Sequence, residues 1–341
     1  MMIIRSKAPL RIGLAGGGSD VAPYSDIYGG AILNATISLY AYASIVPRDD
    51  NKIIINAFDR NERVEYDSME ELPIDGTLDL IKGMYNRVVA DFTEEPLSFE
   101  LTTYVDAPPG SGLGTSSTLG TAVLGAFAHW LKLPLGEYDL AHLAYQIERE
   151  DLLMAGGKQD QYAATFGGVN FMEFYDNDKV IVNPLRIKQS IMNELSNNIV
   201  LFYTQTSRQS SNIIKEQQKN VNDHNEDSIK AMHKIKEQAV IMKEALLRGE
   251  LEKIGEIMDF GWQNKKRMAH NISNPKIDEV YEAALKAGAT GGKISGAGGG
   301  GFMFFYCPNN TSFNVTKTLS QFGTVHKYEF TEHGLFSWKT K

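Results

Sequence analysis

The sequence Pro-Pro-Gly-Ser-Gly-Leu-Gly-Thr-Ser-Ser at positions 108–117 lies between a strand-like stretch, 97–105, and an apolar stretch, 118–131, that is typical of a buried helix. The first N–H groups of a helix have no partner within the helix and carry part of a positive charge. A glycine-rich loop that leads into such a helix is a common phosphate site. We predict phosphate binding by this loop, through Pro109, Gly110, Ser111, Gly112, Leu113, Gly114, Thr115, Ser116 and Ser117.

The loop is not a Walker A sequence, because no lysine lies between Gly110 and Ser117. The hydroxyls of residues 115–117 can supply hydrogen bonds or a metal ligand. A plainer interpretation, a glycine-rich turn followed by a helix cap, stays open at this point.

A second glycine-rich segment, Gly296–Gly301, satisfies the pattern G-x-G-x-x-G of nicotinamide and flavin dehydrogenases. Its context differs from theirs, because the glycines lead into residues 302–306, which are typical of a buried strand rather than a helix. The sequence therefore disfavours a dehydrogenase.

A third segment, Gly16-Gly17-Gly18-Ser19-Asp20, places a carboxylate and a hydroxyl beside glycines. A carboxylate can accept hydrogen bonds from two neighbouring sugar hydroxyls, and glycines let a sugar lie against the backbone. We interpret this segment as a polyol site, with a turn or helix cap as the alternative.

The chain alternates strand-like and helical stretches up to about residue 204 and is mainly helical over residues 210–286. Strand-like stretches return at 292–294, 302–306 and 325–330. This pattern predicts an α+β protein in two parts, and we place the division at 1–190 and 191–341.

The composition argues against several classes of protein. The 341 residues include 34 Lys and Arg against 42 Asp and Glu, without a long basic run, so nucleic acid is not an expected partner. No stretch is long and apolar enough to predict a membrane span or signal peptide. The single cysteine, Cys307, excludes an internal disulfide. We expect a cytoplasmic protein whose oligomeric state, a homodimer included, the sequence leaves open.

The order of the three glycine-rich segments resembles the three motifs of the GHMP kinases, a superfamily named for galacto-, homoserine, mevalonate and phosphomevalonate kinases. Residues 16–30 look most like the heptose 7-phosphate kinases, whose usual form has Thr at the position of Ser19. Galactokinases carry Gly-Glu-His in this segment instead. The resemblance implies an N-terminal lobe like domain 2 of ribosomal protein S5, a ferredoxin-like C-terminal lobe, and a cleft for ATP and sugar between them.

The resemblance also implies roles for single residues. Asp160 matches the aspartate that accepts the sugar hydroxyl proton, and Arg11 matches the arginine of the first motif, which would offset charge on the transferring phosphoryl group. Ser116 and Glu148 match the ligands of Mg²⁺. The sugar would contact Gly17, Gly18, Ser19, Asp20, Tyr24, Gly298 and Gly299.

A sugar that already carries a phosphate needs a second anion site. Arg208 follows a strand-like stretch within a Ser- and Thr-rich segment and is our first candidate, and Lys158 is the second. The sequence thus predicts an ATP- and Mg²⁺-dependent kinase for the anomeric hydroxyl of a heptose 7-phosphate. A kinase for another sugar such as L-fucose, and a regulator that binds sugar and ATP without catalysis, are the alternatives.

Overall fold

Strands β1 (Ile3–Ala15) and β2 (Gly30–Pro47) form a long antiparallel pair at the centre of the molecule. The computed structural model describes residues 2–205 and 210–340. The pairing runs from Ile4 opposite Ile45 to Ala15 opposite Leu33. Both strands are largely apolar and largely buried, as expected for strands that are covered on both faces.

These two strands belong to an eight-stranded sheet with the order β12-β1-β2-β5-β3-β4, in which β6 pairs with the first half of β2 and β7 pairs with β6. The other strands are β3 (Lys52–Ala57), β4 (Glu62–Asp67), β5 (Phe99–Val105), β6 (Val169–Phe174), β7 (Val180–Pro184) and β12 (Phe336–Thr340).

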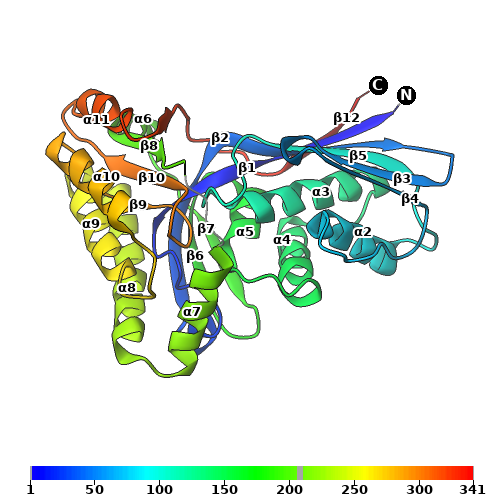
Figure 1. Cartoon of the computed structure of the whole chain (residues 1–341), viewed down its shortest axis with the longest axis horizontal. Helices are drawn as coiled ribbons and strands as arrows, with labels where there is room; N and C mark the ends of the chain where they lie inside the picture. Colours follow the sequence, from blue (N-terminus) through cyan, green and yellow to red (C-terminus); the bar gives the residue numbers. More distant parts are fainter. Residues whose placement is uncertain (1, 206–209, 341) are drawn as a thin grey trace.

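Helix α3 (Thr115–Leu131) packs against β1 and β2, and its apolar residues are buried on nearly all sides in its first three turns. Figure 1 shows the other N-terminal helices gathered around it on the same face of the sheet. These are α2 (Asp79–Phe92), α4 (Glu137–Gln146) and α5 (Gln159–Phe166), while the short α1 (Tyr24–Tyr28) precedes β2. A 3-10 turn, Phe58–Arg60, follows β3.

The C-terminal half contains a four-stranded antiparallel sheet with the order β11-β8-β10-β9. Its strands are β8 (Ile199–Tyr203), β9 (Gly291–Ile294), β10 (Phe302–Tyr306) and β11 (Thr324–His326). The helices of this half are α6 (Gln189–Asn198), α7 (Ser210–Asn222), α8 (Glu226–Arg248), α9 (Ile254–Lys265), α10 (Pro275–Lys286) and α11 (Ser312–Leu319), with a 3-10 turn at Leu251–Lys253. None of the helices in the described ranges is long and apolar enough to cross a membrane.

The last strand returns to the first sheet. Strand β12 pairs antiparallel with β1, with Phe336 opposite Lys7, so both ends of the described chain lie side by side (Figure 1). Residues 336–340 are therefore part of the N-terminal sheet. The division at residue 190 remains a prediction. A division there assigns β12 to the C-terminal part, although β12 pairs with β1 in the N-terminal sheet.

The structure differs from the sequence pattern in several places. The apolar spacing of residues 140–154 is typical of one continuous helix, but α4 ends at Gln146 and a π-helical turn, Ile147–Asp151, follows, in which Leu152 N–H donates to the Ile147 carbonyl. The expected strand 325–330 is limited to 324–326. Strand β7, helix α6 and strand β12 are short and partly exposed, so hydrophobic periodicity does not reveal them.

Candidate active site

A cleft of about 470 Å³ lies where the two halves of the chain meet. One wall comes from β1 and the Gly16–Asp20 segment, a second from the glycine-rich loop, the π-helical turn and the start of α5, and a third from α7, α9 and the Gly296–Gly301 segment. All three glycine-rich segments therefore meet at one site, although they span residues 16 to 301 of the sequence.

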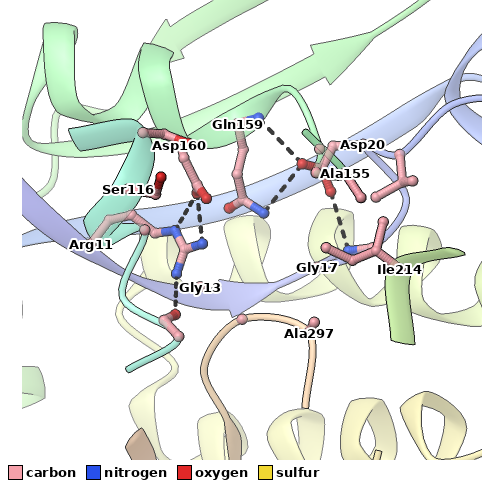
Figure 2. Close-up of a pocket in the computed structure, with 18 of the residues that line it drawn as sticks. Arg11, Gly13, Gly17, Asp20, Ser116, Ala155, Gln159, Asp160, Ile214 and Ala297 are labelled. Atoms are coloured by element: carbon pink, nitrogen blue, oxygen red, sulfur yellow. Dashed lines mark hydrogen bonds and ion pairs between the residues drawn. The ribbon is translucent and has the colours of Figure 1, made fainter. Parts of the chain in front are cut away.

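Arg11 and Asp160 form a partly buried ion pair in this cleft. The Arg11 Nε donates to Asp160 Oδ1 at 2.7 Å, and Nη2 lies 2.6 Å from the same oxygen. Arg11 Nη1 donates to the Gly112 carbonyl at 2.6 Å (Figure 2). The arginine therefore links the candidate base to the candidate phosphate loop.

Asp20 is the second carboxylate of the cleft, and it is 2% exposed. It accepts hydrogen bonds from the backbone N–H of Gly18 and from both the backbone and side-chain nitrogens of Gln159. Burial raises the pKa of Asp20, and the charge of Asp160 raises it further, while the backbone hydrogen bonds act in the opposite direction. Figure 2 shows the Gln159 side chain between the two carboxylates.

The phosphate loop lies as the sequence predicts in relation to α3, which begins at Thr115. Pro109, Gly110, Gly112, Gly114, Thr115, Ser116 and Ser117 line the cleft. Ser111 and Leu113 are buried behind it, and their carbonyl groups accept hydrogen bonds from Phe302 N–H and Arg11 N–H. These two residues hold the loop in place rather than facing the cleft.

The glycines at 112 and 296 let two backbone segments touch. A Cβ at Gly112 would lie 2.3 Å from the Ser295 carbonyl oxygen, and a Cβ at Gly296 would lie 2.7 Å from Gly112 Cα. Both glycines have positive φ, 80° and 76°. Because Gly296–Gly301 connects the antiparallel strands β9 and β10, it is a strand connection and no helix follows it, unlike a dinucleotide fingerprint.

The two predicted metal ligands both line the cleft. Ser116 is exposed on it, and Glu148 lies on the π-helical turn, where its carboxylate accepts from Gln161 Nε2 at 2.7 Å and pairs with Arg149 at 3.1 Å. The described residues contain no group of three or more His, Cys, Asp or Glu side chains that could hold a metal ion. A magnesium site here would need oxygens from the nucleotide, as is usual for that ion.

Several predicted substrate residues do not line the cleft. The Ser19 hydroxyl is buried and bonded to the Gly16 and Ala31 carbonyls, and the Tyr24 hydroxyl contacts His233 Nδ1 at 2.7 Å. In the third segment Gly296 and Ala297 line the cleft, whereas Gly298 and Gly299 pack against Ile272. The structure therefore places these four residues in supporting positions.

The structure describes only one of the two candidates for the second anion site, Lys158. The Lys158 ammonium is buried between Asp26 Oδ1 at 2.9 Å and Asp178 Oδ1 at 3.0 Å, and it does not line the cleft. Its charge is therefore already neutralised within the fold. Arg208 lies outside the described residues.

Sequence reasoning missed three cleft residues from the C-terminal half, Gln217, Lys265 and Lys293. Lys293 lies three positions before Gly296, the start of the third glycine-rich segment, and this is a signal that we did not use. Gln217 lies on a polar helix, and Lys265 lies in the polar run 263–267, where a glutamine or lysine is typical of a solvated surface. Only the tertiary structure shows that they are buried.

A second cavity of about 370 Å³ adjoins the first and shares Pro109, Gly110, Thr115 and Ser116 with it. Its other walls are mostly apolar and include Leu78, Leu119 and Met154. An apolar cavity beside a phosphate loop has the composition expected of a nucleobase site.

Comparison with known proteins agrees with this geometry. Residues 79–168 match the GHMP kinase N-terminal domain, and residues 242–323 match the GHMP kinase C-terminal domain. A D-glycero-alpha-D-manno-heptose 7-phosphate kinase from Campylobacter jejuni is 51% identical over 99% of this chain and 100% of its own length. An L-fucokinase/L-fucose-1-P guanylyltransferase from Bacteroides fragilis is 25% identical over 97% of this chain and 37% of its own length.

The chain is also similar to solved structures of sugar kinases and sugar phosphate kinases. A D-glycero-D-manno-heptose 1-phosphate kinase from Bacteroides thetaiotaomicron has a TM-score of 0.84 and 48% identity, with 99% of both chains covered. A Lactococcus lactis galactokinase with galactose is 21% identical with a TM-score of 0.78, over 98% of this chain and 95% of that one, and shares the fold. The order of the three motifs, the two matched domains and the likeness along the whole chain agree, and this chain belongs to the GHMP kinases.

Proposed function

We propose that this protein transfers the γ-phosphoryl group of ATP to the anomeric hydroxyl of D-glycero-D-manno-heptose 7-phosphate, giving the 1,7-bisphosphate. The observation that carries the proposal is the convergence of Asp160, Arg11 and Asp20 with the glycine-rich loop in one cleft. The 51% identical relative, named as a heptose 7-phosphate kinase, supports the choice of sugar.

ATP fits the loop and the adjoining cavity. The N–H groups at the start of α3 and the loop glycines would contact the phosphates, and the apolar second cavity would hold the adenine. Ser116 lies at the junction of the two cavities, as a residue that contacts the phosphate chain would.

Asp160 is our candidate for the group that accepts the proton of the sugar hydroxyl. Both contacts from Arg11 are made to Oδ1, which leaves Oδ2 for the substrate. A Cβ at Gly114 would lie 3.2 Å from the Asp160 carboxyl carbon, so the carboxylate lies against the start of the phosphate helix. As the new oxygen–phosphorus bond forms and the bond to the β-phosphate oxygen breaks, the hydroxyl proton passes to Asp160.

Asp20 and Gln159 would orient the sugar. Asp20 Oδ2 takes both hydrogen bonds from Gln159, and the Gln159 Oε1 is buried without a hydrogen-bond partner in the described part of the chain. A buried acceptor of this kind favours a bound hydroxyl group. Gly17 and Gly18 lie beside Asp20 in the same wall of the cleft, and we propose that the sugar contacts them there.

Mg²⁺ fits the oxygen donors that Ser116 and Glu148 offer to the cleft. When bound, the ion would neutralise charge on the phosphate oxygens. The Glu148 carboxylate is held by Gln161 and Arg149, so its orientation is set before any ion binds.

The proposal is tested by measuring ADP release with heptose 7-phosphate, heptose 1-phosphate and L-fucose, and by locating the new phosphate with ³¹P NMR. The two heptose phosphates are both needed, because the relatives are named for different phosphate positions. We expect turnover with heptose 7-phosphate and a new signal from a phosphate at C1. Turnover only with L-fucose or with heptose 1-phosphate would refute the proposed substrate.

A further inference from the structure

Three donor side chains from the C-terminal half face Gly17 and Gly18 in the cleft. They are Gln217 on α7, Lys265 at the end of α9 and Lys293 on β9, with exposed fractions of 1%, 3% and 3%. A Cβ at Gly17 would lie 3.6 Å from Lys265 Nζ and 4.0 Å from Lys293 Nζ, and a Cβ at Gly18 would lie 3.5 Å from Gln217 Oε1. The three side chains therefore lie against two consecutive glycines of the cleft wall.

Both ammonium groups in this cluster are bonded to backbone carbonyls. Lys265 Nζ donates to the Gly296 carbonyl at 2.5 Å and the Gly17 carbonyl at 3.5 Å, and Lys293 Nζ donates to the Gly13 carbonyl at 2.7 Å. Across the described residues, no carboxylate forms an ion pair with either lysine. The other two buried lysines differ, since Lys82 pairs with Asp75 and Asp79, and Lys158 pairs with Asp26 and Asp178.

Burying a charged group without a counter-ion destabilises a fold. Burial lowers the pKa of Lys265 to about 8, with Asp20 opposing and Arg11 adding to the effect. Burial also lowers the pKa of Lys293, and the charges of Lys265 and Arg11 lower it further. A cleft with two such cations favours an anionic ligand, because the ligand would supply the missing negative charge.

Gln217 provides an independent observation. Its side-chain amide nitrogen is buried and has no hydrogen-bond acceptor in the part of the chain that the structure describes. An unpaired buried donor costs about 1–3 kcal/mol, and most such groups in proteins have a partner. Because Gln217 lines the cleft and its side-chain amide lies beside Gly18, a ligand oxygen bound in this part of the cleft would satisfy this donor.

We propose that Lys265, Lys293 and Gln217 bind the phosphate group that the sugar substrate already carries. This inference rests on the proposed function and adds the residues that select a sugar phosphate over a neutral sugar. A phosphate group offers three strong acceptor oxygens and a charge of about −1.5 to −2 at pH 7, which suits two ammonium groups and one amide.

The cluster lies between the polyol segment and the glycine-rich loop, because Lys265 Nζ donates to the carbonyls of both Gly17 and Gly296, and Gly296 packs against Gly112 of that loop. In Figure 2, Gly17 and Asp20 lie at one end of the cleft, and Arg11, Asp160 and Ser116 lie at the other. Gly17 is the residue that faces both ammonium groups. A sugar whose anomeric hydroxyl meets Asp160 would therefore extend its far end toward the cluster.

The test compares Lys265→Met with Lys265→Arg, and uses Lys266→Met as the control, because Lys266 is adjacent in sequence but does not line the cleft. KM and kcat are measured for heptose 7-phosphate, for the same heptose without phosphate, and for ATP. We expect Lys265→Met to raise KM for heptose 7-phosphate by roughly tenfold or more, since a hydrogen bond to a charged group is lost. KM for ATP and for the neutral heptose should stay within about twofold of the wild-type values, and Lys265→Arg should recover part of the loss.

Gly17→Ala tests the same site with both lysines intact. The φ of Gly17 is not positive, and the added methyl group would meet the ammonium groups at ordinary contact distance, so the fold should be unchanged. We expect a higher KM for heptose 7-phosphate and an unchanged melting temperature. KM for the same heptose without phosphate is measured with this variant, because a sugar contact at Gly17 would change both KM values and a phosphate contact only the first. The comparison serves even where Lys265→Met fails to fold.

The outcomes keep the two proposals apart. Wild-type protein that does not turn over heptose 7-phosphate refutes the proposed function. Active wild-type protein whose KM for heptose 7-phosphate is unchanged by Lys265→Met or by Gly17→Ala refutes the phosphate site alone. A rise in KM for ATP with an unchanged KM for the sugar phosphate would also refute it, and would assign Lys265 to the transferred phosphoryl group.

Discussion

Arg11 and Asp160 are separated by 149 positions in the sequence, yet their side chains form an ion pair of 2.6 Å in the cleft. Arg11 comes from β1, and Asp160 lies in the first turn of α5. The arginine also donates to the Gly112 carbonyl, so one side chain connects the first sheet strand, the candidate base and the phosphate loop. This contact is the basis of the first prediction.

Replacement of Asp160 by Asn should preserve the shape of the site while removing the proton acceptor. We expect kcat to fall by about 10²-fold or more, the usual contribution of a general base. ATP affinity should change little, because Asp160 is not part of the phosphate loop. Single-turnover kinetics and nucleotide titration would measure the two effects, and near-normal turnover where chemistry limits the rate would exclude Asp160 as the base.

Ser116→Ala should weaken the binding of Mg²⁺. The Ser116 side chain is exposed on the cleft, so its loss should not disturb the packing. We expect the Mg²⁺ concentration for half-maximal activity to rise roughly tenfold, as for loss of one hard oxygen ligand. Ser117→Ala is the matched comparison, since the Ser117 hydroxyl is buried and accepts from Gln161 and Arg149. An effect confined to Ser117→Ala would move the ligand assignment to that residue.

Gly112→Ala should destabilise the contact between the two halves of the chain. The added Cβ would lie 2.3 Å from the Ser295 carbonyl oxygen, and φ at this position is +80°. We expect the free energy of unfolding to fall by about 2 kcal/mol or more through strain and overpacking.

Gly249→Ala provides the control for Gly112→Ala, because Gly249 has a similar φ of +74° but meets only the flexible end of Ile191. Denaturant unfolding would compare the two variants. Equal losses of stability would show that the backbone contact at Gly112 adds nothing beyond the strain of a positive φ.

The affinity for heptose 7-phosphate should fall as the pH rises above about 8. Burial lowers the pKa of Lys265 to about 8, with Asp20 raising and Arg11 lowering it. Lys265 is therefore charged below this pH and neutral above it, so only the lower range offers the full positive charge to a phosphate group. Lys293, whose pKa is also lowered, faces the same point and acts in the same direction.

This pH effect is measured from KM for heptose 7-phosphate between pH 6.5 and 9.5, in comparison with KM for the same heptose without phosphate. The phosphate group itself is largely dianionic above pH 6, so its own titration lies outside most of the range. Lys265→Arg should remove much of the dependence, because arginine stays charged. A flat profile for the wild-type protein would contradict the prediction.

Local sequence was sufficient to predict the strand before the glycine-rich loop and the helix after it. Strand β5, the glycines and the apolar helix α3 follow one another within 33 residues, Phe99–Leu131, and each has a strong local signal. The apolar run 302–306 also predicted β10 at its observed position. Local sequence did not predict β12, because a short, half-exposed strand owes its conformation to the partner strand β1.

The sequence by itself determined the family, the fold class and the three glycine-rich segments, since these depend on residue types at short spacing. Only the tertiary structure decided which polar residues share the cleft. Lys265 and Lys158 are both lysines in polar surroundings of the sequence, yet one is buried against backbone carbonyls at the cleft wall and the other between two aspartates outside it. The physical reason is that the charge state of a lysine, and the ligand it binds, depend on neighbouring groups from distant parts of the chain. The residues next to the lysine in the sequence do not identify these groups.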